Sequence, residues 1–213
     1  MKKNKLIKLF TSFFLILIVA VIVCVAKNNE VITVEKLDSM FDGLDNFELS
    51  TPFVFEEIDE YSIRSFSTPE NVGIDFFCKN GCGFLTFRAM YNGIITHVEP
   101  KLILDQGETD NWAFEIWIML NSKYSILLEF ETWGYSSEVK TQQENNLFVK
   151  VGDYITQGTI IGNLVACQDS AHVHFSLKEQ NVPDEASLIA PESFFSKEAL
   201  RYLDIINLNQ IIF

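Results

Sequence analysis

The chain has 213 residues, a formal net charge of −13 at pH 7 and 13% aromatic residues, including 19 Phe. This length suits one domain with a single core, and the aromatic content excludes a largely disordered chain. Because five lysines and no acidic residue lie in Met1–Lys27, the remainder carries a formal charge near −18. Such an acidic surface excludes nucleic acid and anionic lipid as expected partners of the folded part.

The N-terminal segment has the composition of a membrane anchor. Residues 1–8 contain four lysines, and residues 9–26 contain no charged side chain, which is about the length that spans a bilayer core. The lysines are expected to stay in the cytoplasm, so the chain after Lys27 faces outside. A cleaved signal peptide is the alternative. We predict a basic tip (1–8), a transmembrane anchor (9–26) and an extracytoplasmic C-terminal domain of a single-pass cell-membrane protein.

Residues 27–69 are predicted to be a linker with loosely attached accessory elements. Acidic and polar residues are mixed in this segment, which Pro52 and Pro69 interrupt. A short helix is expected over Val34–Phe41. We therefore place the start of the folded domain at residue 70.

From Asn71 onward the chain has the pattern of a β protein. Runs rich in Phe, Ile, Val, Trp and Tyr recur between turn signals. The polar segment Gly134–Asn146 is expected to be a loop, and Pro191–Ile206 a helix that begins at its proline. The predicted strands are Gly73–Phe77, Phe84–Arg88, Gly93–Val98, Ala113–Asn121, Tyr124–Thr132, Thr159–Leu164 and His172–Lys178.

Cysteine spacing leaves two states open. Cys78 and Cys82 flank an Asn-Gly pair, which is a strong hairpin signal. Outside the membrane they can form a disulfide across that turn or remain free thiols. Cys167 lies five residues before His172, a spacing that matches no established Cys/His zinc pattern.

Two of the three histidines, His172 and His174, are two residues apart. Residues two apart on a strand share a face, so both imidazoles project to one side of the sheet. Two imidazoles on one face can share a metal ion and its bound water. They can also be ordinary surface or packing residues, and so can His97 on an earlier strand.

Five motifs occur in the order found in the zinc-dependent LytM/lysostaphin-type endopeptidases, which cut peptide cross-links in bacterial cell walls. The chain resembles this family from about residue 71 to residue 195. The resemblance implies a mainly β fold, an antiparallel β sandwich or barrel (duplicated hybrid motif), with a short C-terminal helix, at residues 70–213. The motifs are residues 71–76 (NVGIDF), 91–95 (YNGII), 149–162 (VKVGDYITQGTIIG), 172–175 (HVHF) and 189–195 (IAPESFF).

The resemblance implies zinc ligands at Asn71, Asp75 and His174. Asn71 stands where the family has a histidine, and a neutral amide oxygen is a weak zinc ligand beside imidazole. His172 corresponds to a histidine that orients the metal-bound water as a general base. Alignment from Tyr124 places Phe130 at the family's other such histidine.

We therefore predict a catalytically degenerate member of this family. Two protein ligands hold zinc weakly, so weak zinc binding is possible but little or no bound zinc is expected at physiological levels, and a missing oriented donor lowers activity further. The domain is expected to act in the bacterial envelope as a scaffold, regulator or binding module for cell-wall peptide or another envelope protein.

Two alternatives remain open. The first is an active zinc-dependent endopeptidase in which Asn71, His97 or Glu131 completes altered ligation with Asp75, His172 and His174. Glu131 enters only if the alignment around Phe130 slips by one residue, which would bring Glu129 or Glu131 into the site. The second is a resemblance of residues 71–75 to the phosphocarrier domain of sugar phosphotransferase systems, which phosphorylates the histidine that is Asn71 here and works in the cytoplasm.

Overall fold

The computed structural model describes residues 34–39, 47–63, 72–79, 83–104, 110–134, 136–180, 182 and 188–208. The predicted anchor at 9–26 lies outside these residues, as do Asn71 and Cys82. Among the helices that the structure describes, none has the length and apolar composition to cross a bilayer. The prediction of membrane attachment is therefore neither supported nor contradicted.

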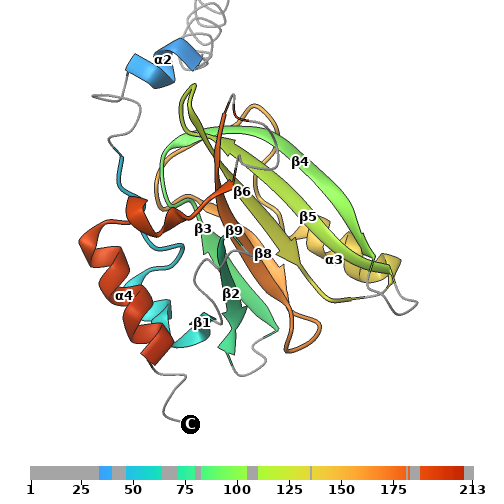
Figure 1. Ribbon diagram of the computed structural model, residues 1–213. Coiled ribbons are helices and arrows are strands. Elements are labelled where there is room, and N and C mark those ends of the chain that lie inside the picture. The colour runs from blue at the N-terminus through green and yellow to red at the C-terminus, as the bar shows by residue number, and fades with distance from the viewer. Residues whose placement is uncertain are drawn as a thin grey trace, which may run out of the picture. The chain divides into compact units, whose positions relative to one another are not determined.

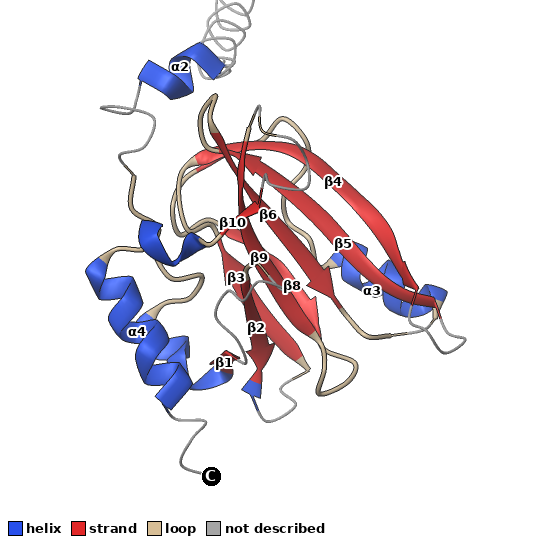
Figure 2. Cartoon of the chain, viewed as in Figure 1, coloured by secondary structure: helices blue, strands red, loops and turns tan. Residues whose placement is uncertain are grey.

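Strands dominate the fold, and all the paired strands of the two sheets run antiparallel (Figures 1 and 2). The larger, eight-stranded sheet has the order β1-β2-β9-β6-β5-β4-β7, with β10 paired to β9, and β3 and β8 form a second sheet. The prediction of a mainly β, antiparallel fold is confirmed. The strands are β1 (Tyr61–Ile63), β2 (Ile74–Cys78), β3 (Phe84–Arg88), β4 (Gly93–Leu104), β5 (Asp110–Met119), β6 (Tyr124–Glu131), β7 (Tyr154–Ile155), β8 (Ile160–Val165), β9 (His172–Glu179) and β10 (Leu188–Ile189).

The core lies on one face of the large sheet. Phe87, from the small sheet, packs edge-to-face against Phe76 and Phe130 of the large sheet, with ring centroids 5.6 and 5.9 Å apart. All three rings are buried. The small sheet therefore covers this face of β2, β9 and β6. Side chains at alternate positions of the same strands point to the opposite face.

The predicted loop at Gly134–Asn146 is wrong, because Ser137–Asn145 forms helix α3. Ser136 caps its N-terminus by accepting a hydrogen bond from the Val139 amide at 3.3 Å. The buried side chain of Gln143 donates a hydrogen bond to the Asn163 carbonyl at 3.0 Å and accepts one from the Val165 backbone amide at 2.8 Å. Polar anchoring to β8 replaces an apolar stripe here, so the sequence lacks the periodicity by which a helix is recognised.

The C-terminal helix is confirmed in position but is interrupted. A 3-10 turn, η4 (Pro191–Phe194), precedes helix α4 (Lys197–Leu208). Phe195 between them is extended and bridges to Leu49. The Ser196 hydroxyl then caps α4 by accepting from the Ala199 amide at 3.1 Å.

Residues 47–63 belong to the folded unit, which corrects their prediction as a linker. Leu49, Tyr61 and Ile63 are buried in the core, and β1 pairs with β2. A 3-10 turn, η1 (Phe55–Glu60), connects these parts. Because polar and apolar residues are mixed in this segment, the sequence does not reveal the few apolar side chains that pack on the sheet. The expected short helix is α2 (Val34–Ser39).

In the glycine-rich hairpin at residues 149–162, two glycines adopt the backbone conformation that tight turns need. Gly152 and Gly158 have φ values of +91° and +85°, in the left-handed region that favours glycine. Gly162 has a different role, because a Cβ there would lie 2.6 Å from the Asn146 carbonyl oxygen.

Candidate functional site

Three adjacent strands bring the predicted site residues together on the face opposite the core. In the register of β2 and β9, Asp75 pairs with His174 and Phe77 with His172. Strand β6 flanks β9 on its other side and sets Glu131 opposite His172. Figure 1 shows β2, β9 and β6 side by side. We call Asp75, His172, His174 and Glu131 the polar cluster.

Both ring nitrogens of His174 have hydrogen-bond partners. Nδ1 lies 2.6 Å from Oδ1 of Asp75, and Nε2 lies 2.8 Å from the hydroxyl of Ser176. That hydroxyl donates to the Val72 carbonyl at 2.6 Å, so its oxygen accepts from Nε2–H. Both nitrogens of His174 therefore act as donors, which is the arrangement of an imidazolium paired with a carboxylate.

Electrostatics agree with this assignment. Burial lowers the pKa of His174, but the hydrogen bond to Asp75 and the negative charges of Asp75, Glu129 and Glu131 outweigh it, so the pKa is raised. Asp75 and His174 are each mostly shielded from solvent. A charged pair of this kind is held by its hydrogen bonds as well as by attraction.

His172 has a different hydrogen-bond pattern. Its Nδ1 lies 2.8 Å from the Ser170 carbonyl oxygen, and a carbonyl only accepts, so Nδ1 carries the proton. Nε2 faces two carboxylates, at 3.7 Å from Oδ1 of Asp75 and 3.6 Å from Oε2 of Glu131. The ring of Phe77 stacks on the imidazole with centroids 4.8 Å apart. The plane of the His172 ring and the proton on its Nδ1 are thus both fixed.

The placement of Phe130 in the site is wrong. Phe130 is fully buried and belongs to the core face of β6, because side chains alternate along a strand. Its neighbours Glu129 and Glu131 point to the site face, opposite His174 and His172. The side chain from β6 beside His172 is therefore the carboxylate of Glu131. Burial raises the pKa of Glu131, the His172 charge opposes this, and Glu129 adds to it.

A row of further carboxylates crosses the same face. The register pairs Glu129 with Glu115 and Glu115 with Glu99. The ammonium of Lys101 lies 2.5 Å from Glu129 and 3.4 Å from Glu115, and the Trp117 indole donates to Glu115. We call Glu99, Lys101, Glu115, Trp117 and Glu129 the acidic strip.

His97 does not reach the polar cluster. It lies on β4, where it pairs with Trp117, and β5 and β6 separate it from β9. Its Nε2 is 3.7 Å from Glu99 and 4.0 Å from Glu115. The suggestion that His97 completes a metal site with Asp75 and His174 is therefore wrong.

The zinc ligands that the sequence resemblance implies do not fit the metal as they stand. Donor atoms on a tetrahedral zinc ion at about 2.0–2.1 Å lie roughly 3.3–3.4 Å apart. Nδ1 of His174 and Oδ1 of Asp75 are only 2.6 Å apart, which is a hydrogen bond. Asn71 lies outside the described residues. Within the described part of the chain, no group of three or more His, Cys, Asp or Glu side chains is arranged so that it could hold a metal ion.

The cysteines lie apart from this chemistry. Cys78 is disulfide-bonded, with a partner outside the described residues. Cys167 is a free, exposed thiol, and burial of its sulfur raises the thiol pKa. An elevated pKa disfavours the thiolate that binds metals.

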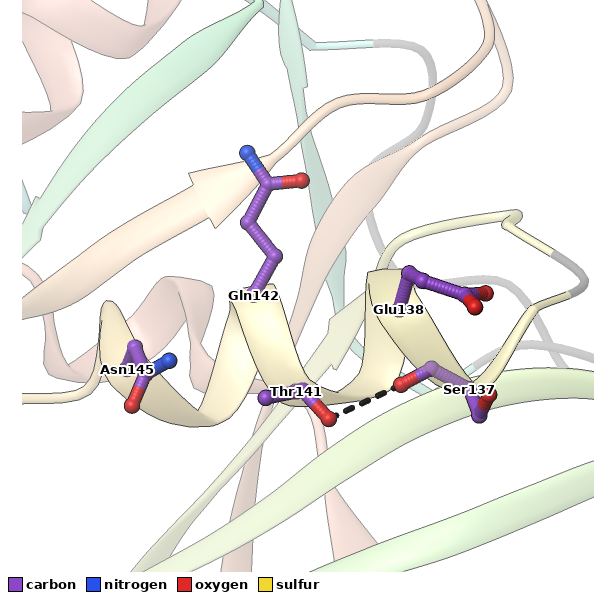
Figure 3. A pocket seen from close by; sticks show the side chains of 5 residues that line it. All are labelled: Ser137, Glu138, Thr141, Gln142 and Asn145. Carbon is purple, nitrogen blue, oxygen red and sulfur yellow. Dashed lines mark hydrogen bonds between the residues drawn. The ribbon is translucent and has the colours of Figure 1, made fainter.

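A separate hollow lies on α3, outside the polar cluster. Figure 3 shows its polar lining along one side of the helix, where the Thr141 hydroxyl donates to the Ser137 carbonyl at 2.9 Å. No histidine or basic side chain lines it, and it is wide open to solvent. The hollow offers no chemistry of its own. Its lining residues are Ser137, Glu138, Thr141, Gln142 and Asn145.

Comparisons with known proteins give two named likenesses at low similarity. No family model and no curated protein sequence matches the chain. One similar solved structure is titled "NMR solution structure of lysostaphin": 19% identity, TM-score 0.42, covering 70% of this chain and 56% of that one. Another is titled "Identification and structural characterization of LytU": 19% identity, TM-score 0.39, covering 76% of this chain and 98% of that one.

Likenesses at this level support few conclusions. The chain spans 56% of the length of the lysostaphin structure, and both superpositions are too loose to decide fold or activity. The fold is therefore established by the strand pairing alone. The functional interpretation depends on the polar face of the large sheet.

Proposed function

We propose that this chain is a membrane-anchored, LytM-like domain of the bacterial cell envelope that binds cell-wall peptide or another envelope protein without cleaving it. The anchor would be residues 9–26, and residues 47–208 would lie outside the membrane. The motif order in the sequence supports the family, and the acidic strip on the large sheet supports binding.

The hydrogen bonds of His174 argue against hydrolysis. A zinc peptidase needs an imidazole lone pair directed at the metal and a metal-bound water. Here Asp75 and Ser176 occupy both His174 nitrogens, so His174 has no free lone pair to offer. Freeing one would break a charge-assisted hydrogen bond in a shielded site, which costs about 1–3 kcal/mol.

The acidic strip supports a binding role. Its carboxylates extend from β6 across β5 to β4, and Lys101 already compensates part of their charge. Such a surface favours a cationic peptide segment and disfavours an acidic one, mainly through the association rate and the choice of partner. Trp117 adds an aromatic ring beside the charges, and the ammonium of Lys178 lies over this ring at 4.7 Å from its centroid.

The test uses the full chain in detergent, mixed with purified cell-wall sacculi and with fluorescent Lys-rich or Glu-rich peptides of equal length. We expect sedimentation with sacculi or binding of the Lys-rich peptide, with no soluble wall fragments released. Glu115→Lys should weaken binding about tenfold by reversing one charge of the strip. Glu144→Lys, an equal charge change on α3, is the matched control and should bind like the parent.

Two results would overturn the proposal. Release of wall fragments that chelator abolishes and zinc restores would show an active zinc endopeptidase with altered ligation. Equal binding of the Lys-rich and Glu-rich peptides, with no sedimentation with sacculi, would remove the assigned role of the acidic strip.

A further inference from the structure

We propose that the outer edge of β4 binds an extended peptide, which joins the large sheet as a further antiparallel strand. The outer edge consists of the backbone groups of residues 98–102 that point away from β5. The peptide alternates apolar and basic residues. This inference rests on the proposed binding function and deepens it, because it states how the ligand is held and which sequence pattern it has.

Strand β4 has a free side over most of its length. β7 pairs with only two residues of β4, and further backbone bonds on this side join Ile95 to Gly152 and Asp153. From residue 96 to residue 104, no described strand lies against this side of β4. Figure 1 shows β4 as a long strand along the border of the sheet. A free edge of this length is a template for strand addition.

The pairing of β5 determines which backbone groups of β4 point outward. The Trp112 carbonyl of β5 accepts from the Thr132 amide, so the backbone groups of Trp112 face β6. Because bonding directions alternate along an antiparallel strand, the next residue, Ala113, faces β4, where Lys101 is its partner in the register. The backbone groups of the residues before and after Lys101 therefore point to the free side.

Pro100 agrees with this assignment. A proline has no N–H, so it fits a strand best where that N–H would face outward. By the same alternation the N–H and C=O groups of Val98 and Leu102 point outward, and they have no backbone partner in the described part of the chain. The peptide residues opposite Val98 and Leu102 each exchange two hydrogen bonds with β4, and the residue opposite Pro100 donates one.

The two faces of this edge select an alternating peptide. On one face Val98 packs against the core and Leu102 is 40% exposed, so apolar peptide residues suit the positions opposite them. On the other face the side chain of Glu99 is 69% exposed, while Lys101 is directed across β5 to Glu129. The outermost charge at the edge is therefore the Glu99 carboxylate, which favours a basic residue opposite it.

Charge also favours a basic peptide over a second copy of the chain. Residues 28–213 carry a formal charge near −18, so two copies repel each other. Pro100 would also remove one hydrogen-bond donor from each edge of such a pair. A basic peptide is attracted by the same charge and brings a complete set of backbone donors.

The first measurement uses the full chain in detergent and fluorescent peptides in which Lys and Val alternate. In the antiparallel register the Val residues lie opposite Val98 and Leu102 and donate their amides to β4, whereas the Lys amides point to solvent. N-methylation of the Val residues should weaken binding about tenfold or more, because these hydrogen bonds are lost. N-methylation of the Lys residues is the matched control and should leave the affinity nearly unchanged.

Amide hydrogen exchange, followed by NMR on the same complex, locates the contact. The amides of Val98 and Leu102 should exchange slowly only when the peptide is bound. The amides of Glu99 and Lys101 face β5 and are the internal control, with slow exchange in both states. Leu102→Pro removes one outward N–H and should weaken binding about tenfold, whereas Leu102→Val keeps this N–H and should bind like the parent. Circular dichroism checks that both variants are folded.

Saturating binding without slower exchange at Val98 and Leu102 overturns the inference, and so does an equal effect of the two N-methylations. Slow exchange of these amides in the peptide-free chain, increasing with chain concentration, would assign the edge to a second copy and overturn it as well. The proposed function fails separately. It is lost if neither the peptides nor sacculi bind, and it survives if the peptides bind without protecting the edge.

Discussion

The two faces of strands β6 and β9 carry opposite kinds of side chain at neighbouring positions. Val173, Phe175 and Phe130 lie on the core face, while the other face carries His172, His174 and Glu131 of the polar cluster. The core face is covered by the small sheet, whereas the side chains of the polar cluster keep 12–15% of their surface exposed. A one-residue change of register would exchange the two faces completely.

This contrast separates stability from function along the same strands. Buried aromatic packing holds the strands together, and the polar cluster contributes stability mainly through the Asp75–His174 pair. Substitutions on the core face should therefore alter folding, and those on the site face should alter binding.

The largest expected effect tests the core face directly. Phe130→Ala removes a fully buried ring that contacts Phe87, so the free energy of unfolding should fall by about 3–5 kcal/mol. The matched change on the site face is Glu131→Gln, for which we expect a change within about 0.5 kcal/mol in the presence of chelator. Urea denaturation measures both. If Phe130→Ala lowered the free energy of unfolding less than Glu131→Gln does, the assignment of faces would be wrong.

Gly73, the residue directly before β2, tests how tightly the site face is packed. A Cβ at Gly73 would lie 2.5 Å from the Phe175 carbonyl oxygen and 2.6 Å from Cε1 of His174. Gly73→Ala should lower the free energy of unfolding by about 1–3 kcal/mol through this overpacking and shift the His174 NMR signals.

Gly83→Ala is the comparison for that variant. Gly83 has φ +78° and open space around it. Gly83→Ala should therefore lower the free energy of unfolding by about 1 kcal/mol through backbone conformation alone. The His174 signals should not move in this variant. Unmoved His174 signals in Gly73→Ala would contradict the close contact.

The sequence predicts the strands well because their alternating pattern is local. The motif alignment misplaces the site residue of β6, because it sets Phe130 at the position of a histidine that orients the metal-bound water. The alternation of buried and polar side chains along this strand would have selected Glu131 instead. The predicted strand Gly93–Val98 continues to Leu104 in β4 and so includes Pro100, a residue that does not suit the interior of a central strand. Beyond Ile94, β4 has β5 on one side and no partner on the other among the described strands, so the proline is tolerated.

Other parts of the site could not be predicted from local patterns. The contact of Ser176 with His174, and the fixing of His172 by the Ser170 carbonyl, depend on rotamers and on chain positions set by the fold. Lys101 reaches Glu129 across β5, which becomes apparent only once three strands are in register. The helix α3 was missed because polar contacts, and not an apolar stripe, attach it.

The Asp75–His174 pair should make stability depend on pH. The folded pKa of His174 is raised above its ordinary value, so the pair stabilises the fold below the unfolded pKa, and this contribution is lost as the pH rises through the folded pKa. Asp75→Asn should lower the His174 pKa and cost about 1–2 kcal/mol at low pH, with a smaller cost at high pH. NMR titration and urea denaturation of the metal-free chain measure the two effects. An unchanged His174 pKa in Asp75→Asn would contradict the pair.

The smallest effect is expected at Lys101 in the acidic strip. Its pKa is lowered by burial but raised more by Glu129 and Glu115, so the net shift is upward. The side chain is 47% exposed, however, and solvent screening limits such a pair to about 0–1 kcal/mol. Lys101→Met should therefore leave stability nearly unchanged while it strengthens binding of the Lys-rich peptide, because it leaves Glu129 and Glu115 uncompensated. Both effects should shrink in high salt. A large loss of stability in Lys101→Met would mean that the strip holds the fold together, and the contrast between the two faces of the sheet would no longer hold.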